Sequence, residues 1–135
     1  MSPASTRSKS TNEIPLASSS VSAGFTSPAE DTVDQTLDLN AHLVRHPAAT
    51  FFVRVSGNSM EGANIFSGDI LVVDRSLQAT SGKIVVAIVE NEFTVKRLVK
   101  SKGKTLLVAE NPAYPPIENN FEVWGVVTYI IHAAK

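Results

Sequence analysis

From Thr50 onward, short apolar runs alternate with polar turn residues, a pattern typical of β-strands joined by tight connections. The sequence predicts six strands: Thr50–Val55, Ile70–Val73, Lys83–Val89, Glu92–Val99, Lys104–Ala109 and Val123–Ile131. Only Glu90 and Asn91 separate the third strand from the fourth, which is short enough for a tight hairpin that pairs these strands in antiparallel fashion. We therefore predict a mostly β domain over residues 50–135, either a curled antiparallel sheet or a small sandwich.

Residues 1–23 differ from the rest of the chain in composition. Serine recurs there, and Ile14 and Leu16 are the only large aliphatic residues before Val21. Such a stretch cannot bury enough apolar surface to offset the entropy that is lost on ordering. We therefore expect residues 1–23 to form a flexible N-terminal arm, and we predict no strand before Thr50.

Residues 24–49 read as a connecting segment that contains one short helix. Three apolar residues are spaced for one face of that helix: Leu39, Leu43 and Val44. Asp38 or Asn40 would cap its N-terminus, and the helix should end before Pro47. Further upstream, Ser27-Pro28 has the residue types that begin a helical turn.

Composition narrows the class of protein. The chain has 135 residues, of which 43% are hydrophobic and 19% are charged, as expected for one globular domain. Twelve basic residues nearly balance 13 acidic ones, so no overall field attracts a polyanion. Cysteine is absent, which excludes disulfides and thiolate catalysis. Because no apolar run approaches the ~18–20 residues of a membrane span and no secretory signal is present, we expect a cytoplasmic protein.

Ser59 and Lys96 are the candidate catalytic pair. A serine hydroxyl is a poor nucleophile near neutral pH and needs a nearby base. Lys96 lies in a strand-like run in which Thr94 and Lys96 point to one face, and partial burial there would lower the pKa of the lysine until it can accept a proton. Taken alone the pair is a weak signal, because a turn serine and a solvated strand lysine occur in most chains.

Neighbouring residues have simpler interpretations. Gly57 and Gly62 are turn glycines, and around a reactive serine they would let the backbone bend so that amides point at a substrate carbonyl. Met60 is expected to pack in the core. Arg97 should point away from Lys96, because adjacent residues of a strand face opposite sides.

Two histidines and two aspartates have side chains of the kinds that bind metals. His42 and His46 are four residues apart, but no third ligand has an obvious spacing, so two surface histidines are favoured. Asp69, which follows Gly68, and Asp74 are interpreted as turn and cap residues.

Several further motifs accompany the serine and lysine in a fixed order. They are Ser56-Gly57-Asn58-Ser59-Met60, Gly62, Ile65, Gly68-Asp69, Val73-Asp74, Phe93–Leu98, Asn111–Ile117 and Val123–Val127. This set resembles the Ser-Lys self-cleaving peptidases of the LexA and UmuD family. Upstream, the segments Ala23–Ala29, Leu37–Asn40 and His46–Thr50 resemble the UmuD-type members. The resemblance covers about residues 23–135.

The resemblance implies a fold and a reaction. The fold would be a LexA/UmuD-like peptidase domain of curled antiparallel sheets with a flexible N-terminal arm. Ser59 would attack the bond between Ala23 and Gly24, with Lys96 as the base and the backbone amides of Asn58 and Ser59 as the oxyanion hole. The family uses neither a metal nor another cofactor.

The resemblance also implies partners. In UmuD-type proteins a RecA filament on single-stranded DNA promotes the cleavage after DNA damage. The trimmed form, here residues 24–135, would be a homodimer and the accessory subunit of an error-prone, UmuC-like Y-family polymerase. We expect no membrane association and no sequence-specific DNA binding.

Other classes of protein fit the sequence less well. A signal peptidase would need a membrane anchor, and a LexA-type repressor would need a DNA-binding domain, but the residues before the predicted cleavage site are serine-rich and fit no helix-turn-helix pattern. The remaining alternative is a non-enzymatic, polymerase-binding module in which the serine and lysine are silent.

Overall fold

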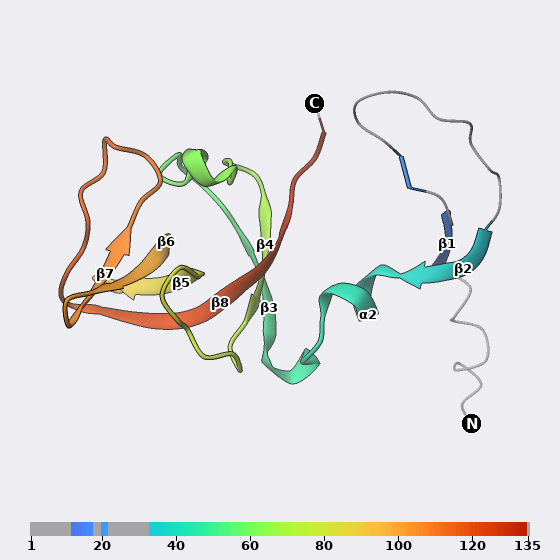
Figure 1. Cartoon of the computed structure of the whole chain (residues 1–135), viewed down its shortest axis with the longest axis horizontal. Coiled ribbons are helices and arrows are strands. Elements are labelled where there is room, and N and C mark those ends of the chain that lie inside the picture. The colour runs from blue at the N-terminus through green and yellow to red at the C-terminus, as the bar shows by residue number, and fades with distance from the viewer. Residues whose placement is uncertain (1–11, 18–19, 22–32, 135) are drawn as a thin grey trace. The chain divides into compact units, whose positions relative to one another are not determined.

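The computed structural model describes residues 12–17, 20–21 and 33–134, in two compact units that comprise residues 1–44 and 45–135. In the first unit, strands β1 (Glu13–Ala17) and β2 (Val33–Asp38) pair in antiparallel fashion, and helix α2 (Leu39–Leu43) follows β2 directly (Figure 1). The carboxylate of Asp38 accepts a hydrogen bond from the Ala41 amide at 3.3 Å, so Asp38 is the N-cap. The predicted short helix is therefore confirmed.

The β1–β2 pair corrects the prediction that no strand precedes Thr50. Every residue of β1 is exposed, and Pro15 lies within it, so the alternation and burial that mark a strand in sequence are missing. The turn predicted at Ser27-Pro28 and the bond between Ala23 and Gly24 lie outside the described residues. The flexible arm over residues 1–23 stays a prediction.

The second unit is mostly β, as predicted. Its sheet has six strands in the order β3-β4-β8-β5-β6-β7, and all neighbouring strands are antiparallel. The strands are β3 (Thr50–Arg54), β4 (Ile70–Asp74), β5 (Ile84–Val89), β6 (Glu92–Ser101), β7 (Lys104–Val108) and β8 (Phe121–Ile131). Two 3-10 helices, η2 (Pro47–Ala49) and η3 (Glu61–Ala63), lie before and after β3. All six predicted strands are confirmed, with boundaries that differ by at most two residues.

The predicted hairpin between β5 and β6 is also confirmed. Glu90 and Asn91 have φ values of 52° and 65°, the left-handed conformation that a two-residue type I′ turn requires. This turn sets the register of the pair, in which Val85 lies opposite Lys96. The turn therefore fixes where Lys96 lies along the sheet.

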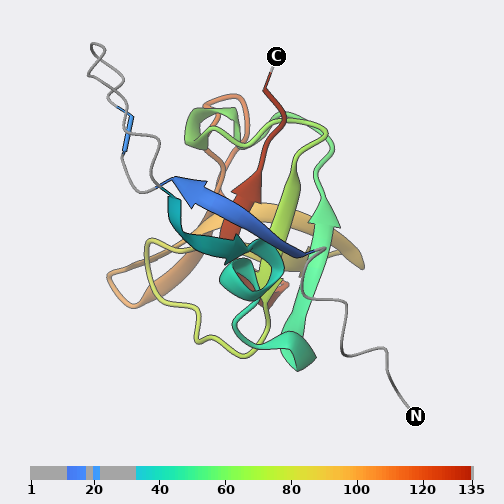
Figure 2. The same ribbon diagram turned by 90° about the vertical axis from the view of Figure 1, so that its right-hand side faces the viewer.

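Strand β8 is the central strand that joins the two halves of the sheet (Figures 1 and 2). One extra residue interrupts its register on each side, Trp124 against β5 and Thr128 against β4. The hydroxyl of Thr128 donates to the Val72 carbonyl at 3.2 Å, and Nε of Arg75 donates to the Trp124 carbonyl at 2.8 Å. Such irregularities bend a strand, so β8 gives the sheet its curl without leaving these carbonyls unpaired.

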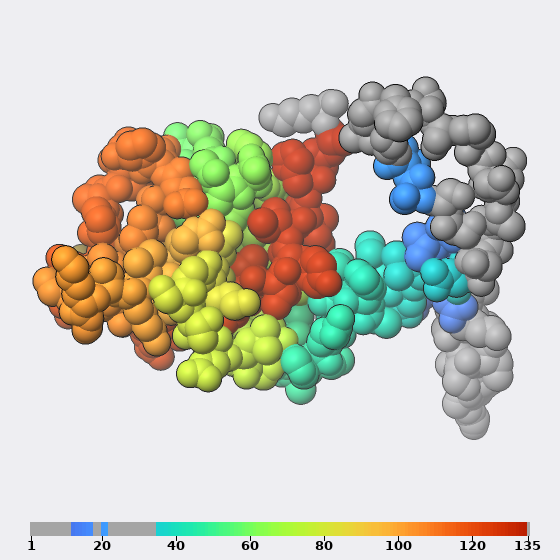
Figure 3. All heavy atoms as spheres, viewed as in Figure 1, coloured from blue at the N-terminus to red at the C-terminus, as the bar shows by residue number. Residues whose placement is uncertain are grey.

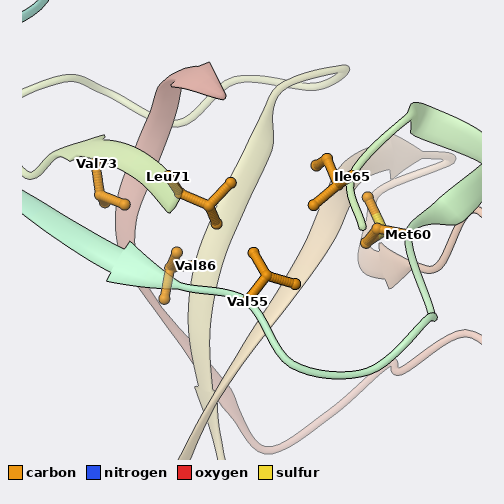
Figure 4. Close-up of a cluster of buried hydrophobic side chains, with 6 residues drawn as sticks. All are labelled: Val55, Met60, Ile65, Leu71, Val73 and Val86. Atoms are coloured by element: carbon orange, nitrogen blue, oxygen red, sulfur yellow. The ribbon is translucent and has the colours of Figure 1, made fainter. Parts of the chain in front are cut away.

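Two clusters of buried side chains form the core of the second unit. One consists of Val55, Met60, Ile65, Leu71, Val73 and Val86 (Figure 4), and the other of Val85, Ala87, Leu98, Leu107 and Val126. Met60 and Ile65 lie side by side in Figure 4 and come from the connection between β3 and β4. Burying a side chain of this size contributes about 1.5–3 kcal/mol, so the core fixes this connection. The prediction that Met60 packs in the core is confirmed.

Candidate active site

Ser59 lies in the connection between β3 and β4, residues 55–69, which we name the serine loop. The amides of Val55 and Gly68 close its base, with bonds of 2.8 Å to the carbonyls of Asp69 and Val55 respectively. Met60, the residue after Ser59, is only 3% exposed. Ser59 is thus held at the rim of the core by a buried neighbour while its own side chain stays partly accessible.

Lys96 lies in β6 and is only 6% exposed. Its Nζ lies 2.9 Å from Oγ of Ser59, and it also donates to Oγ1 of Thr94 at 3.0 Å and to the carbonyl of Val95 at 3.3 Å. No carboxylate of a described residue pairs with this amine. Desolvation by burial lowers the pKa of Lys96 from its ordinary value of 10.5. The alternative of a solvated strand lysine is therefore wrong.

The contacts of Lys96 suit a neutral amine. A neutral amine has two hydrogens and one lone pair, and the two hydrogens can go to Thr94 and to the Val95 carbonyl. The lone pair then faces Ser59, whose hydroxyl becomes the donor across the same 2.9 Å. This is the geometry that proton transfer from a nucleophile to a base requires.

Two surface pockets flank the Ser59–Lys96 pair. One pocket, of about 110 Å³, is lined by Ser59 and by apolar side chains of β3, the serine loop, β5 and β6. The other, of about 340 Å³, is lined by Lys96, Tyr114 and residues at the end of the β5–β6 hairpin. Phe93 and Thr94 line both pockets. The pair is therefore open to a chain that would lie across the two hollows.

The predicted oxyanion-hole amides, those of Asn58 and Ser59, are the next feature of the serine loop. No described residue accepts a hydrogen bond from either amide. Gly57 precedes them with a φ of 96°, in the left-handed region that favours glycine, and a Cβ added there would meet nothing within 4 Å. The glycine is therefore needed for backbone conformation and not for space.

The connection between β7 and β8, residues 109–120, packs against the serine loop and is named the clamp loop here (orange and green in Figures 1 and 3). The Glu110 amide donates to the Ser59 carbonyl at 3.0 Å, and the Gly62 amide donates to the Glu110 carbonyl at 2.9 Å. A Cβ on Gly62 would lie 2.3 Å from the Glu110 carbonyl oxygen, so only glycine allows this approach. Arg97 points away from Lys96, as predicted, and pairs with Glu110 at 3.3 Å.

Three residues at the site have contacts that the sequence did not assign. Thr94 binds Lys96, as described above. In the clamp loop, Nδ2 of Asn111 donates to the Asn58 carbonyl at 3.1 Å, and the hydroxyl of Tyr114 donates to Oδ1 of Asn58 at 2.7 Å. Strand alternation had already placed Thr94 on the face of Lys96, but no pattern in the sequence shows which loop Asn111 and Tyr114 touch.

Two buried aspartates lie at the ends of β4. Asp69 and Asp74 accept hydrogen bonds from backbone amides two or three residues away, as expected of turn residues. Each also binds a histidine at 2.6 Å, His132 with Asp69 and His46 with Asp74. Across the described ranges there is no group of three or more acidic, histidine or cysteine side chains placed to hold a metal ion. Nor do those ranges contain a helix of the length and apolarity that crossing a membrane takes.

Comparison with known protein families identifies the class to which this protein belongs. Residues 15–128 match the model of a family described as Peptidase S24-like. The chain belongs to this family of serine self-cleaving peptidases, and the resemblance drawn from its sequence motifs is confirmed.

Individual relatives share most of this chain. Protein MucA of Salmonella typhimurium is 49% identical over 123 residues, which are 87% of this chain and 84% of MucA. Protein SamA of Salmonella typhimurium strain LT2 is 46% identical over 122 residues, which are 90% of this chain and 86% of SamA. A LexA repressor of Pseudomonas chlororaphis is 39% identical over 102 residues, which are 76% of this chain and 50% of that repressor.

Proposed function

We propose that the protein is a serine peptidase that cleaves its own chain between Ala23 and Gly24. Ser59 is the nucleophile and Lys96 is the base. The observation that carries the proposal is the 2.9 Å contact between Oγ of Ser59 and Nζ of a lysine that is only 6% exposed. A buried amine with a lowered pKa and no carboxylate partner among the described residues is suited to accept the serine proton.

The proposed reaction has two stages. Neutral Lys96 takes the hydroxyl proton while Oγ of Ser59 bonds to the Ala23 carbonyl carbon, and the amides of Asn58 and Ser59 stabilise the oxyanion. The bond from Ala23 to the Gly24 nitrogen then breaks, and Lys96 returns the proton to that nitrogen. In the second stage a water gives a proton to Lys96 and its oxygen to the acyl carbon. The bond from that carbon to Oγ of Ser59 then breaks, and Lys96 passes the proton to Oγ, which restores the Ser59 hydroxyl.

The chain is long enough for this reaction to occur within one molecule or between two. Thirty-five residues separate Gly24 from Ser59, and an extended chain spans up to ~3.3–3.6 Å per residue. A glycine after the scissile bond adds no side chain that would obstruct the base. Val21 and Phe25 flank the bond with apolar side chains, which suit the apolar walls beside Ser59.

The proposed biological role follows from the family and from the UmuD-type relatives. We assign the protein to the SOS response to DNA damage, with cleavage promoted in the cytoplasm by a RecA filament on single-stranded DNA. The product, residues 24–135, is proposed to form a homodimer that serves as accessory subunit of an error-prone, UmuC-like polymerase. Support comes from identities of 46–49% with SamA and MucA over most of this chain.

The test is the intact mass of the purified chain after incubation, with and without RecA on single-stranded DNA. It is run at pH 7 and at about pH 10, near the ordinary pKa of lysine, beside the variants Ser59→Ala and Lys96→Ala. The proposal requires a product that begins at Gly24 and that is absent from both variants. An unchanged mass under every condition would leave a polymerase-binding module with a silent pair, to be tested by binding.

A further inference from the structure

The clamp loop forms hydrogen bonds with the backbone carbonyls of both Asn58 and Ser59. Nδ2 of Asn111 donates to the Asn58 carbonyl at 3.1 Å, and the Glu110 amide donates to the Ser59 carbonyl at 3.0 Å. The hydroxyl of Tyr114 holds the Asn58 side chain at 2.7 Å. Asn58 and Ser59 are thus tied to one loop through three separate groups.

The bond from Asn111 has a directional consequence. A peptide unit is planar and trans, so its carbonyl and its N–H point in opposite directions. Fixing the Asn58 carbonyl therefore fixes the direction of the Ser59 N–H. A carbonyl that accepts a hydrogen bond also polarises its peptide unit and strengthens the N–H on the other side as a donor.

The clamp loop is itself built to hold a set position. Leu107 and Ile117 exchange two backbone hydrogen bonds of 2.9 Å, which close the loop at its base, and Leu107 is fully buried. Oδ1 of Asn111 accepts a bond from the Ala113 amide at 3.0 Å, which orients the side-chain amide whose Nδ2 reaches Asn58. Both the nitrogen and the oxygen of the Asn111 side-chain amide are therefore hydrogen-bonded.

We propose that Asn111 and Tyr114 are positioning residues that hold the amide of Ser59 ready as an oxyanion-hole donor. The inference rests on the proposed self-cleavage and extends it, because it assigns a role to side chains that make no hydrogen bond to Lys96. Donors fixed in advance stabilise the developing charge without reorganising, and this is where much of the rate of acyl transfer arises.

The test compares self-cleavage rates of the wild type with Asn111→Ala, Asn111→Asp and Tyr114→Phe between pH 7 and about pH 10.5. Asn111→Asp keeps the acceptor for the Ala113 amide but loses the donor to Asn58, so it separates positioning from support of the loop. Tyr114→Phe keeps the ring, whose centroid lies 5.8 Å from Nζ of Lys96, and removes only the bond to Asn58. Thermal unfolding of every variant is followed in parallel.

We expect Asn111→Ala and Asn111→Asp to lower the maximal rate by about 10-fold or more, which is less than the roughly 10²–10³-fold cost of deleting an oxyanion donor outright. Tyr114→Phe should lower it by about threefold. The midpoint of the pH profile should not move in Asn111→Ala or Tyr114→Phe, because neither substitution removes a hydrogen bond of Lys96 or adds a charge.

Three outcomes would overturn the inference. Wild-type rates in Asn111→Asp would show that the residue only supports the loop, and a displaced pH midpoint in Asn111→Ala would show that it acts through Lys96. If the wild type itself does not cleave, the proposed function fails together with the inference, whereas cleavage that is insensitive to Asn111 removes the inference alone.

Discussion

Thr94 and Lys96 are joined by a side-chain hydrogen bond of 3.0 Å between residues two apart on one face of β6. The threonine hydroxyl accepts a hydrogen bond from the amine, and this bond helps to direct the lone pair of Nζ toward Ser59. The amine is therefore oriented by its own strand before any substrate arrives.

Replacing this hydroxyl should impair the base. We expect Thr94→Val to lower the maximal self-cleavage rate by roughly 10-fold, because a misoriented amine transfers protons poorly. Thr94→Ser, which keeps the acceptor, is the matched control and should retain most of the activity. A wild-type rate in Thr94→Val would show that the hydroxyl is not needed to orient the amine.

The rate of self-cleavage should depend on pH through Lys96. Only the neutral amine accepts a proton, and burial lowers its pKa below 10.5. The rate should therefore rise with pH and reach half of its maximum below pH 10.5. Lys96→Arg should be inactive throughout, since arginine stays charged. A flat rate between neutral and alkaline pH would argue against Lys96 as the base.

The burial of Lys96 also lowers the free energy of unfolding near neutral pH, because the charged amine is desolvated in the folded state. The folded state holds the lysine proton less tightly than the unfolded chain does, so the free energy of unfolding should rise as pH passes the lowered pKa, up to the unfolded value near 10.5. Lys96→Met should remove this rise and raise the thermal midpoint at pH 7, because no charged amine is then buried. The exposed Lys100→Met serves as the control, which should change little.

Gly62→Ala should disrupt the packing of the serine loop against the clamp loop. Its Cβ would lie 2.3 Å from the backbone oxygen of Glu110, which cannot rotate away. We expect a loss of about 1–3 kcal/mol of stability, as for other overpacked sites, and a marked fall in cleavage rate. In Gly103→Ala the new Cβ meets nothing within 4 Å, and the cost is only the strain of a φ of 81°. That variant should cleave at the wild-type rate, and a loss of activity in both would point to general destabilisation.

Asp74 should support folding above mildly acidic pH. Desolvation by burial acts to raise the pKa of Asp74, but hydrogen bonds from Ser76 and His46 outweigh it and hold the pKa below 3.8. The stabilisation is therefore complete above the unfolded pKa and is lost as pH falls through the lower folded value. Asp74→Asn should unfold more easily than the wild type at pH 7, and this difference should shrink as pH falls below 3.8, while exposed Glu122→Gln should match the wild type throughout.

The features that depend on neighbouring residues along the chain, namely the strands and the tight turn, were predicted from the sequence. Alternation and turn residues located every strand of the second unit, and the two-residue connection at Glu90-Asn91 predicted the β5–β6 pairing that places Lys96. The family motifs singled out Ser59 and Lys96, and the two side chains lie in contact. Their catalytic roles stay proposals until cleavage is measured.

Features that depend on distant contacts were not predictable. The β1–β2 pair has no buried face, so hydrophobic periodicity could not reveal it. The interruptions of β8 at Trp124 and Thr128 follow from how three strands fit together. Asn111 reaches Asn58 across 53 positions, and a single sequence has no signal for a side chain that meets a backbone carbonyl so far away.

The central position of β8 has a consequence for the order of events during synthesis. Ser59 belongs to the β3–β4 half of the sheet and Lys96 to the β5–β6–β7 half, and β8 is the strand that pairs with both halves. It is also the last of these strands to leave the ribosome. A nascent chain that ends before β8 has both residues but lacks the strand that pairs with both halves of the sheet. Under the proposed mechanism, a newly made chain therefore cannot cleave itself until this sheet is complete.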